Sequence, residues 1–248
     1  MAFFGGLDTA VLSWINGYVG RSAAIDDAVR VLADWNFARS ILLGCFVLGA
    51  WFKLNDRDSR LKIVAGIAGL LAATGLSRLL QVAMPLHARP FNSIDEFGLN
   101  VPRNLDTHWG FASSFPSDTA TLYFALAAII YSLSRAWGIA AFVWVATVIA
   151  LPRVYILYHW PSDIVAGLAL GIACVAIAQH FRNTVPQFDK AVMLEKLEPQ
   201  LFYPVLFVLL YQIVDSFAAV ELVLHEISAL GKHLAGSHEV ARAIGVPL

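Results

Sequence analysis

The sequence predicts an all-α integral membrane protein, a six-helix bundle with short interfacial helices at the N- and C-termini. Of its 248 residues, 58% are hydrophobic and only 14% are charged, whereas soluble domains carry roughly 25% charged residues. The mean hydropathy of +0.67 points the same way. Because hydrocarbon offers no partner for an open backbone group, apolar segments that cross a bilayer must be helical.

Charge and cysteine content argue against several other classes of protein. The net charge is −1 and no basic block is present, so we expect no nucleic-acid partner. Cys45 and Cys174 both lie inside apolar runs, which is typical of buried hydrophobes and not of a disulfide framework or a CxxC metal site. The first residues, MAFFGGLDTAVLSW, lack a basic stretch followed by an apolar one, so no cleavable signal peptide is expected.

Short amphipathic helices are predicted at both ends of the chain. Over residues 7–36, apolar residues recur at helical spacing on either side of the polar pair Asp26–Asp27. This pattern suits two helices lying at the membrane interface better than one span. The tail 225–248 mixes histidines and basic residues with small apolar residues, and we interpret it as an interfacial cap.

Six uncharged blocks between these ends each predict one membrane span. A span needs about 20 residues, and charged side chains at helix ends can snorkel to the interface, which lets each helix extend past its block. The predicted spans are 38–54, 61–83, 117–134, 138–155, 161–181 and 200–222.

The chain is accordingly expected to have three parts: the interfacial helices over 1–36, a core over 37–182 with the long loop 84–116, and the last span with the tail over 183–248. Alternation of the spans places this loop, the turn 156–160 and both termini on one membrane face. The opposite face holds four of the five lysines, which favours the cytoplasm there. By analogy we expect a bacterial inner membrane, with the first face extracytoplasmic.

Three polar clusters from distant parts of the chain meet at that first face. They read PLHARPF (85–91), SSFPSDTA (113–120) and RVYILYHWPSD (153–163). In the third, Pro161 suits the first turn of a helix, which puts Asp163 in that turn and His159 just before it. An aspartate so placed accepts a hydrogen bond from one imidazole nitrogen, which leaves the other nitrogen to act as a nucleophile or a base.

Anion-binding groups surround this histidine in the predicted arrangement. Arg89 and Arg153 provide planar donor forks suited to phosphate or carboxylate, and Ser117 begins a helix whose N–H groups and dipole favour an anion. Together these groups predict an oxyanion site.

Simpler interpretations of the same residues stay open. Arg89 alone suits a lipid headgroup contact, and Ser117 alone suits a plain N-cap. His159 and Asp163 are also spaced as metal ligands, but no further ligand is evident, and we expect neither a metal nor a cofactor.

The motifs resemble those of the type 2 phosphatidic acid phosphatase superfamily over about residues 5 to 182. RVYILYHWPSD reads as the third signature, Arg-x5-His-x3-Asp. RPF at 89–91 resembles the end of the first signature, and FPSDTA at 115–120 resembles the second, normally Pro-Ser-Gly-His. The resemblance implies a six-helix, metal-independent lipid phosphatase or phosphotransferase.

The resemblance also implies a role for each matched residue. The match to His159 attacks phosphorus and forms a phosphohistidine, and the match to Asp163 orients it. The matches to Arg89, Ser117 and Arg153 hold the phosphoryl oxygens.

Two positions depart from the family pattern. The lysine of the first signature is replaced by Val82, and the nearest basic residue is Arg78, one helical turn further back, which could bind phosphate in its place. The general-acid histidine of the second signature corresponds to Thr119, whose hydroxyl is far too weak an acid.

Three residues are candidates to supply the missing proton. Asp118 stands where glycine is usual and is either an acid or a helix cap. His87 and His108 lie in the loop and are either acids that reach inward or surface residues.

The missing acid bears on the substrate. Loss of a general acid lowers the reaction rate by about 10² to 10⁴. The loss is larger for an alkoxide leaving group, which needs a proton, than for a phosphate, whose second pKa is about 6. We therefore predict a membrane phosphohydrolase or phosphotransferase acting on a lipid phosphate or diphosphate, with polyprenyl diphosphate favoured. The alternative is a catalytically silent relative that binds or moves a phospholipid or lipid-linked sugar. An inactivating substitution at position 119 would leave the same pattern.

Overall fold

The computed structural model describes residues 5–35, 37–103, 105, 107 and 113–214. All regular structure in these residues is helical. In chain order the elements are α1 (Gly6–Asn16), α2 (Ala23–Asp34), η1 (Phe37–Ile41), α3 (Leu42–Lys53), α4 (Arg57–Ala83), η2 (Pro90–Ser93), α5 (Ile94–Phe97), α6 (Asp118–Leu133), α7 (Arg135–Trp144), η3 (Val145–Ala150), α8 (Leu151–Tyr155), α9 (Pro161–His180), α10 (Pro186–Leu197) and α11 (Pro199–Val214).

The all-α prediction is confirmed over the described residues. Three helical segments are long and apolar enough to cross a membrane, namely Arg57–Ala83, Arg135–Tyr155 and Pro161–His180. Asp118–Leu133 and Pro199–Ile213 are apolar but shorter. The count of six spans therefore stays a prediction.

Other predicted elements agree with the structure in part. The two short helices expected over 7–36 are present as α1 and α2. The last predicted span, 200–222, is helical as far as residue 214, and the remainder of it lies outside the described residues, as does the tail 225–248. Between the predicted spans 161–181 and 200–222, where no further helix was predicted, the chain forms α10.

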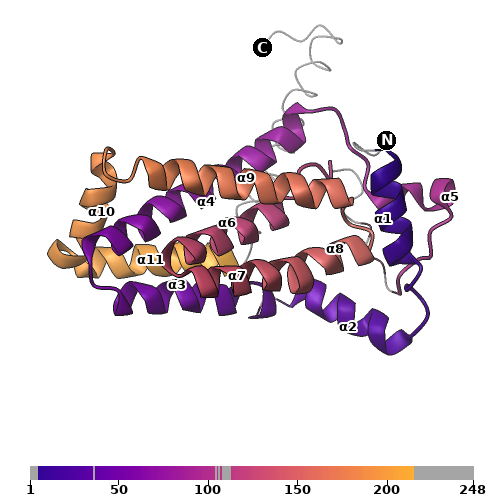
Figure 1. Ribbon diagram of the computed structural model, residues 1–248, viewed down its shortest axis with the longest axis horizontal. Coiled ribbons are helices and arrows are strands. Elements are labelled where there is room, and N and C mark those ends of the chain that lie inside the picture. The colour runs from indigo at the N-terminus through magenta and orange to yellow at the C-terminus, as the bar shows by residue number, and fades with distance from the viewer. Residues whose placement is uncertain (1–4, 36, 104, 106, 108–112, 215–248) are drawn as a thin grey trace, which may run out of the picture.

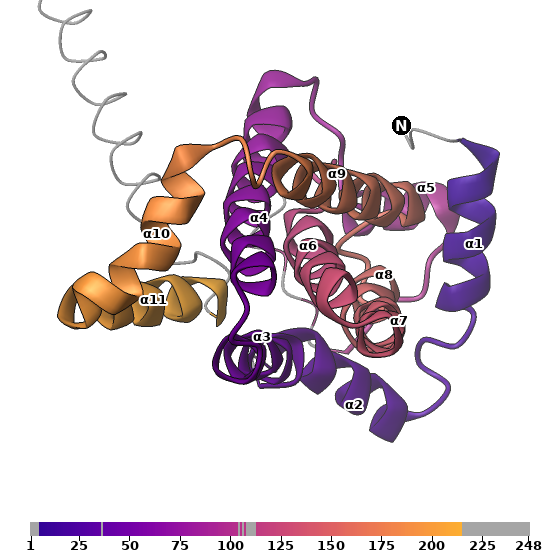
Figure 2. The ribbon, with the colours of Figure 1, turned by 60° about the vertical axis from the view of Figure 1, so that its left-hand side comes forward.

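Helices α4, α6 and α9 pack together at the centre of the bundle, as Figure 2 shows. On α9, a Cβ added to Gly167 would lie 2.7 Å from the carbonyl oxygen of Ser117, and one added to Gly171 would lie 2.6 Å from that of Thr121. Such small residues let two helix backbones touch. This contact holds the start of α6 against the first turns of α9.

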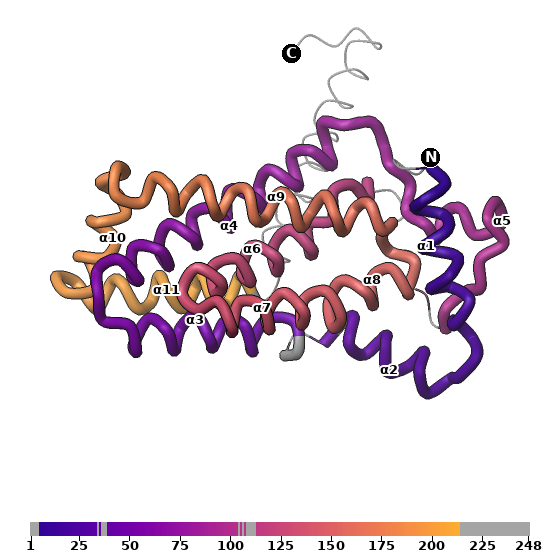
Figure 3. Tube along the Cα trace, viewed as in Figure 1, coloured from indigo at the N-terminus to yellow at the C-terminus, as the bar shows by residue number. Residues whose placement is uncertain are grey.

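The two ends of the bundle are built differently. At one end, α1 lies across the C-terminal end of α8 and the N-terminal end of α9 (Figures 1 and 3). We call this the α1 end. At the other end, α10 packs against α4 and α11 (Figure 2), and we call this the α10 end.

Ion pairs fasten α10 to α4 at the α10 end. Arg57 makes a two-bond contact with Asp189, at 2.9 and 2.7 Å. Arg60 forms a salt bridge with Glu195 and donates to the side chain of Asn55 at 2.9 Å. These ion pairs join α10 to α4 and so stabilise α10. Local sequence signals alone did not predict this helix.

Candidate active site

The turn between α8 and α9 carries His159 and is held by backbone hydrogen bonds. The N–H groups of Tyr158 and His159 donate to the carbonyl of Arg153 at 3.0 and 3.3 Å, and the N–H of Phe91 donates to the carbonyl of Leu157 at 3.1 Å. Leu157 is fully buried with φ 63°, a left-handed conformation that costs a non-glycine residue about 1–2 kcal/mol. The surrounding contacts fix the turn in this conformation.

The hydrogen bond of His159 identifies which ring nitrogen can react. The side chain is buried, and Nδ1 lies 3.1 Å from the carbonyl oxygen of Ser114 and 3.5 Å from Oδ2 of Asp163. A carbonyl oxygen only accepts hydrogen bonds, so Nδ1 carries the proton. The neutral ring therefore keeps its lone pair on Nε2, the state that a nucleophile needs.

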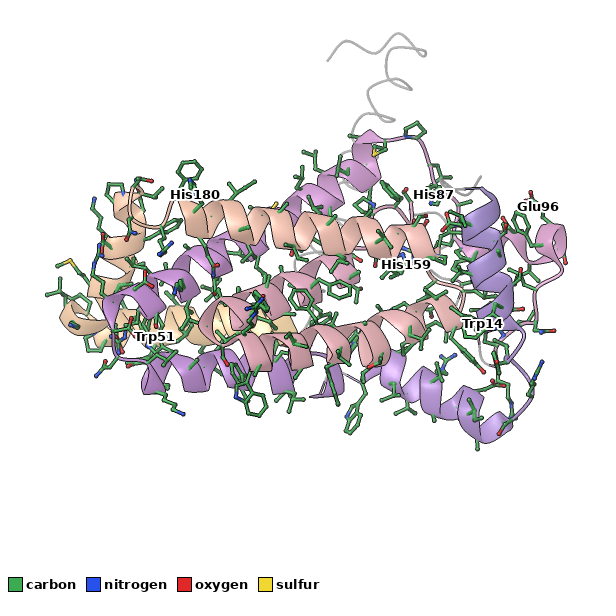
Figure 4. The ribbon with its side chains drawn as sticks, viewed as in Figure 1. Trp14, Trp51, His87, Glu96, His159 and His180 are labelled. Carbon is green, nitrogen blue, oxygen red and sulfur yellow. The ribbon has the colours of Figure 1, made fainter. Side chains whose placement is uncertain are left out.

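Asp163 is fully buried between two imidazoles. Its Oδ2 accepts a hydrogen bond from the N–H of Trp160 at 2.8 Å, and its Oδ1 lies 3.3 Å from Nδ1 of His87. Figure 4 shows His87 and His159 near the N-terminal end of α9. The carboxylate thus supports the first turn of its own helix and faces both rings.

The structure places His87 inside the site, 5% exposed. The hydroxyl of Ser114 donates to the carbonyl of His87 at 3.1 Å, so this hydroxyl accepts from Nδ1 of His87, 2.8 Å away. His87 is therefore a buried neighbour of Asp163 and not a surface residue. His108 lies outside the described residues.

Arg89 and Arg153 both lie against Tyr158, the residue before the candidate nucleophile. Arg89 donates from Nη1 to the carbonyl of Tyr158 at 3.1 Å. The guanidinium of Arg153 lies over the Tyr158 ring, 5.6 Å from its centroid. Both side chains are half-buried, and the charge of Arg89 acts on His159.

Ser117 and Asp118 begin α6 at the same end of the bundle. The Ser117 hydroxyl accepts from the N–H of Ala120 at 3.3 Å, as an N-cap does, and the Ser117 N–H donates to the carbonyl of Asp163 at 3.1 Å. Asp118 forms a 2.7 Å salt bridge with Arg78 and accepts from the N–H of Thr119 at 2.7 Å. Asp118 also interacts electrostatically with His159.

Val82, at the position of the family lysine, is 86% exposed. Arg78 is the basic residue of α4 that reaches the start of α6, through its pair with Asp118. Its phosphate-binding role remains a proposal, as does that of Ser117.

Burial sets the protonation state of the candidate nucleophile. Desolvation lowers the pKa of His159 below its ordinary value, and the charge of Arg89 acts in the same direction, whereas Asp163 and Asp118 raise it. Burial has the larger effect, so the imidazole is neutral at neutral pH.

Two residues of this end had no role in the sequence analysis. Ser114 lies in the second polar cluster and contributes its backbone carbonyl. Every residue type has this group, so the sequence does not indicate its role. Asp8 of α1 is buried and bonds to Ser162. The only sequence signal for Asp8 is a lone acid at the start of an amphipathic helix.

The fold and the site together define a class: an all-helical bundle with membrane-length apolar helices and a cationic, histidine-centred site at one end. Residues 67–186 match the model of the PAP2 superfamily. This match confirms the resemblance of the motifs to that superfamily. Every predicted site residue that the structure describes falls within it.

Two curated relatives come from Escherichia coli K12. The chain is 32% identical over 132 residues to YbjG, named as a candidate undecaprenyl-diphosphatase, covering 52% of this chain and 61% of the relative. It is 27% identical over 164 residues to lipid A 1-diphosphate synthase, covering 61% of this chain and 67% of the relative. The chain thus spans about three fifths of the length of the first relative. No solved structure matches significantly.

Proposed function

We propose that this protein is a membrane phosphohydrolase or phosphotransferase that acts on a lipid diphosphate, with polyprenyl diphosphate as the favoured substrate. The observation that carries the proposal is the buried His159, whose Nδ1 donates to the Ser114 carbonyl and whose Nε2 keeps its lone pair. The names of both relatives refer to diphosphates of lipids. We further propose a bacterial inner membrane, with the site facing its extracytoplasmic side.

The proposed reaction has two halves. Nε2 of His159 attacks the terminal phosphorus while the bond from that phosphorus to the bridging oxygen breaks, and the lipid monophosphate leaves. Arg89 and Arg153 stabilise the charge on the phosphoryl oxygens. Water or an acceptor lipid then attacks the phosphohistidine, which regenerates the imidazole and releases a proton.

The start of α6 supports a diphosphate as the substrate. Asp118 is paired with Arg78 at 2.7 Å, and an arginine so close keeps a carboxylate ionised. Neither this carboxylate nor the Thr119 hydroxyl donates a proton readily. A phosphate leaving group tolerates this, because its own second pKa is about 6, whereas the alkoxide released from a phosphatidic acid does not.

Purified full-length protein in detergent tests the proposal. We expect faster phosphate release from polyprenyl diphosphate than from phosphatidic acid, and covalent labelling of the protein by a diphosphate with a labelled terminal phosphate. His159→Ala should abolish both the turnover and the label. Faster turnover of phosphatidic acid, or equal turnover by His159→Ala, would reject it.

The second candidate function is lipid binding without catalysis, as in a silent relative. It is favoured by Val82 and Thr119, which stand where the family signatures have a lysine and the general-acid histidine. The same arginines would then hold a phosphate headgroup. A silent binder takes no covalent label from the diphosphate, so the labelling experiment separates the two functions.

A further inference from the structure

The first turn of α9 lacks a side-chain acceptor at its N-cap position. Helix starts leave N–H groups without intrahelical partners, and a side-chain oxygen at the preceding position usually accepts from one of them. Here that position is Trp160, whose indole can only donate and which donates to the carbonyl of Ala88 at 2.8 Å.

Asp8, from α1, provides the missing acceptor. Its Oδ1 accepts from the N–H of Ser162 at 2.8 Å, and its Oδ2 accepts from the Ser162 hydroxyl at 2.6 Å. The two residues are 154 positions apart in the chain, and they are 2% and 4% exposed. A buried carboxylate is costly unless it is well hydrogen-bonded, and the N-terminus of a helix is a favourable place for it.

The capped turn is the one that carries the catalytic pair. Ser162 immediately precedes Asp163, whose carboxylate accepts from the Trp160 N–H and lies beside His159. A shift of the Ser162 amide therefore shifts Asp163 and the turn that presents the imidazole. Asp8 itself lies outside the family match, which begins at residue 67.

We propose that Asp8 is a positioning residue, which caps α9 from another helix and so holds Asp163 and His159 in the reactive arrangement. This inference rests on the proposed function. If Asp8 has this role, α1, which was predicted only as an interfacial helix, contributes a positioning residue to the site.

Asn16 offers a matched control on the same helix. Its side chain exchanges hydrogen bonds with Asn100 at 2.9 and 2.7 Å, so it ties α1 to the loop and not to α9. It is also buried, at 4% exposure. Asn16→Ala therefore loosens α1 without removing the cap.

The test compares Asp8→Ala, Asp8→Asn and Asn16→Ala as full-length proteins with polyprenyl diphosphate. We expect Asp8→Ala to lower kcat on the order of 10²-fold, as misplacement of reacting groups by about 1 Å does, with KM unchanged. Asp8→Asn keeps an acceptor oxygen for the Ser162 N–H and should recover most of the rate. Asn16→Ala should retain the wild-type kcat.

Three results would overturn the inference: a wild-type kcat for Asp8→Ala, equal losses in Asp8→Ala and Asn16→Ala, or no recovery in Asp8→Asn. If Asp8→Ala does not fold, Asp8→Glu replaces it, because one extra methylene displaces the oxygens. A wild-type kcat for Asp8→Glu would then count against the cap.

Labelling distinguishes this inference from the proposed function. If His159→Ala still takes the phosphate label and turns over, the proposed function is wrong. If His159→Ala loses both and Asp8→Ala behaves as wild type, only the role of Asp8 is wrong.

Discussion

The α1 end and the α10 end use the same residue types for different purposes. At the α10 end, guanidinium groups meet carboxylates from other elements, in the pairs Arg57–Asp189, Arg60–Glu195 and Arg182–Asp58. At the α1 end, Arg89 and Arg153 contact the carbonyl and the ring of Tyr158. At the α10 end, arginine paired with carboxylate joins one helix to another, whereas at the α1 end Arg89 and Arg153 lie around the residue that precedes His159, and the charge of Arg89 acts on both His159 and Asp118.

The pair between Arg78 and Asp118 lies between these two cases. It belongs to the α1 end, yet it joins α4 to α6, as Arg57–Asp189 and Arg60–Glu195 join α4 to α10. Its carboxylate also reduces the positive charge close to His159. The comparison therefore predicts that arginines of the two ends respond differently to substitution.

The largest effect is expected from removing an arginine of the α1 end. Arg153→Ala should lower kcat/KM by about 10² to 10³, as loss of an oxyanion donor does. Arg153→Lys should recover only part of the lost kcat/KM, because lysine lacks the planar donor fork of arginine. Arg57→Ala, at the α10 end, should leave kcat/KM unchanged. Equal losses at the two ends, measured by phosphate release, would contradict different roles for these arginines.

A second prediction concerns the missing acid. Thr119→His should raise the turnover of phosphatidic acid by about 10², the lower value for general acid catalysis, with little change for polyprenyl diphosphate. Thr119→Ala is the matched control and should change neither rate. An equal rise for both substrates would contradict the argument from the leaving group.

The pH dependence should follow the environment of His159. An ordinary histidine has a pKa of about 6.5. Because burial lowers the pKa of His159, its imidazole stays neutral at pH values below this. Activity should then fall about tenfold per pH unit once the pH drops below the lowered pKa.

Asp163→Asn identifies the group that titrates. Asp163 raises the pKa of His159, so its loss should move the acid limb of kcat/KM to lower pH in whatever activity remains. A limb that stays in place would belong to the substrate instead.

The smallest effect on turnover is expected at the α10 end, where substitutions should act on stability. Arg60 and Glu195 have side chains only 9% and 11% exposed, and breaking a buried pair costs about 3–5 kcal/mol. Arg57 is 61% exposed, and exposed pairs contribute about 0.2–1 kcal/mol. Thermal unfolding should therefore show a larger loss for Arg60→Ala than for Arg57→Ala, with kcat retained in both.

The sequence predicted the parts of the site that depend on local spacing. Asp163 lies four residues after His159, at the start of a helix that Pro161 marks, and alternation of helices brought Arg89 to the same end. These arrangements follow from helix geometry and from the order of apolar blocks.

The remainder depends on tertiary contacts. The acceptor for His159 is the backbone carbonyl of Ser114, which any residue could supply, and the cap from Asp8 requires α1 to lie across α9. Helix α10 was missed because its contacts with α4 are between side chains of distant segments, such as Arg57 and Asp189. His87 was ambiguous because its loop carries no periodic pattern that could indicate burial.

The backbone contact between α6 and α9 at Gly167 and Gly171 limits how these two helices can move when a ligand binds. At these two positions α9 has no side chain that could repack, and a methyl group at Gly171 would meet the Thr121 oxygen at 2.6 Å. The spacing of α6 and α9 is therefore preset before any ligand binds. Adaptation to headgroups of different size falls to the segments outside this rigid seam.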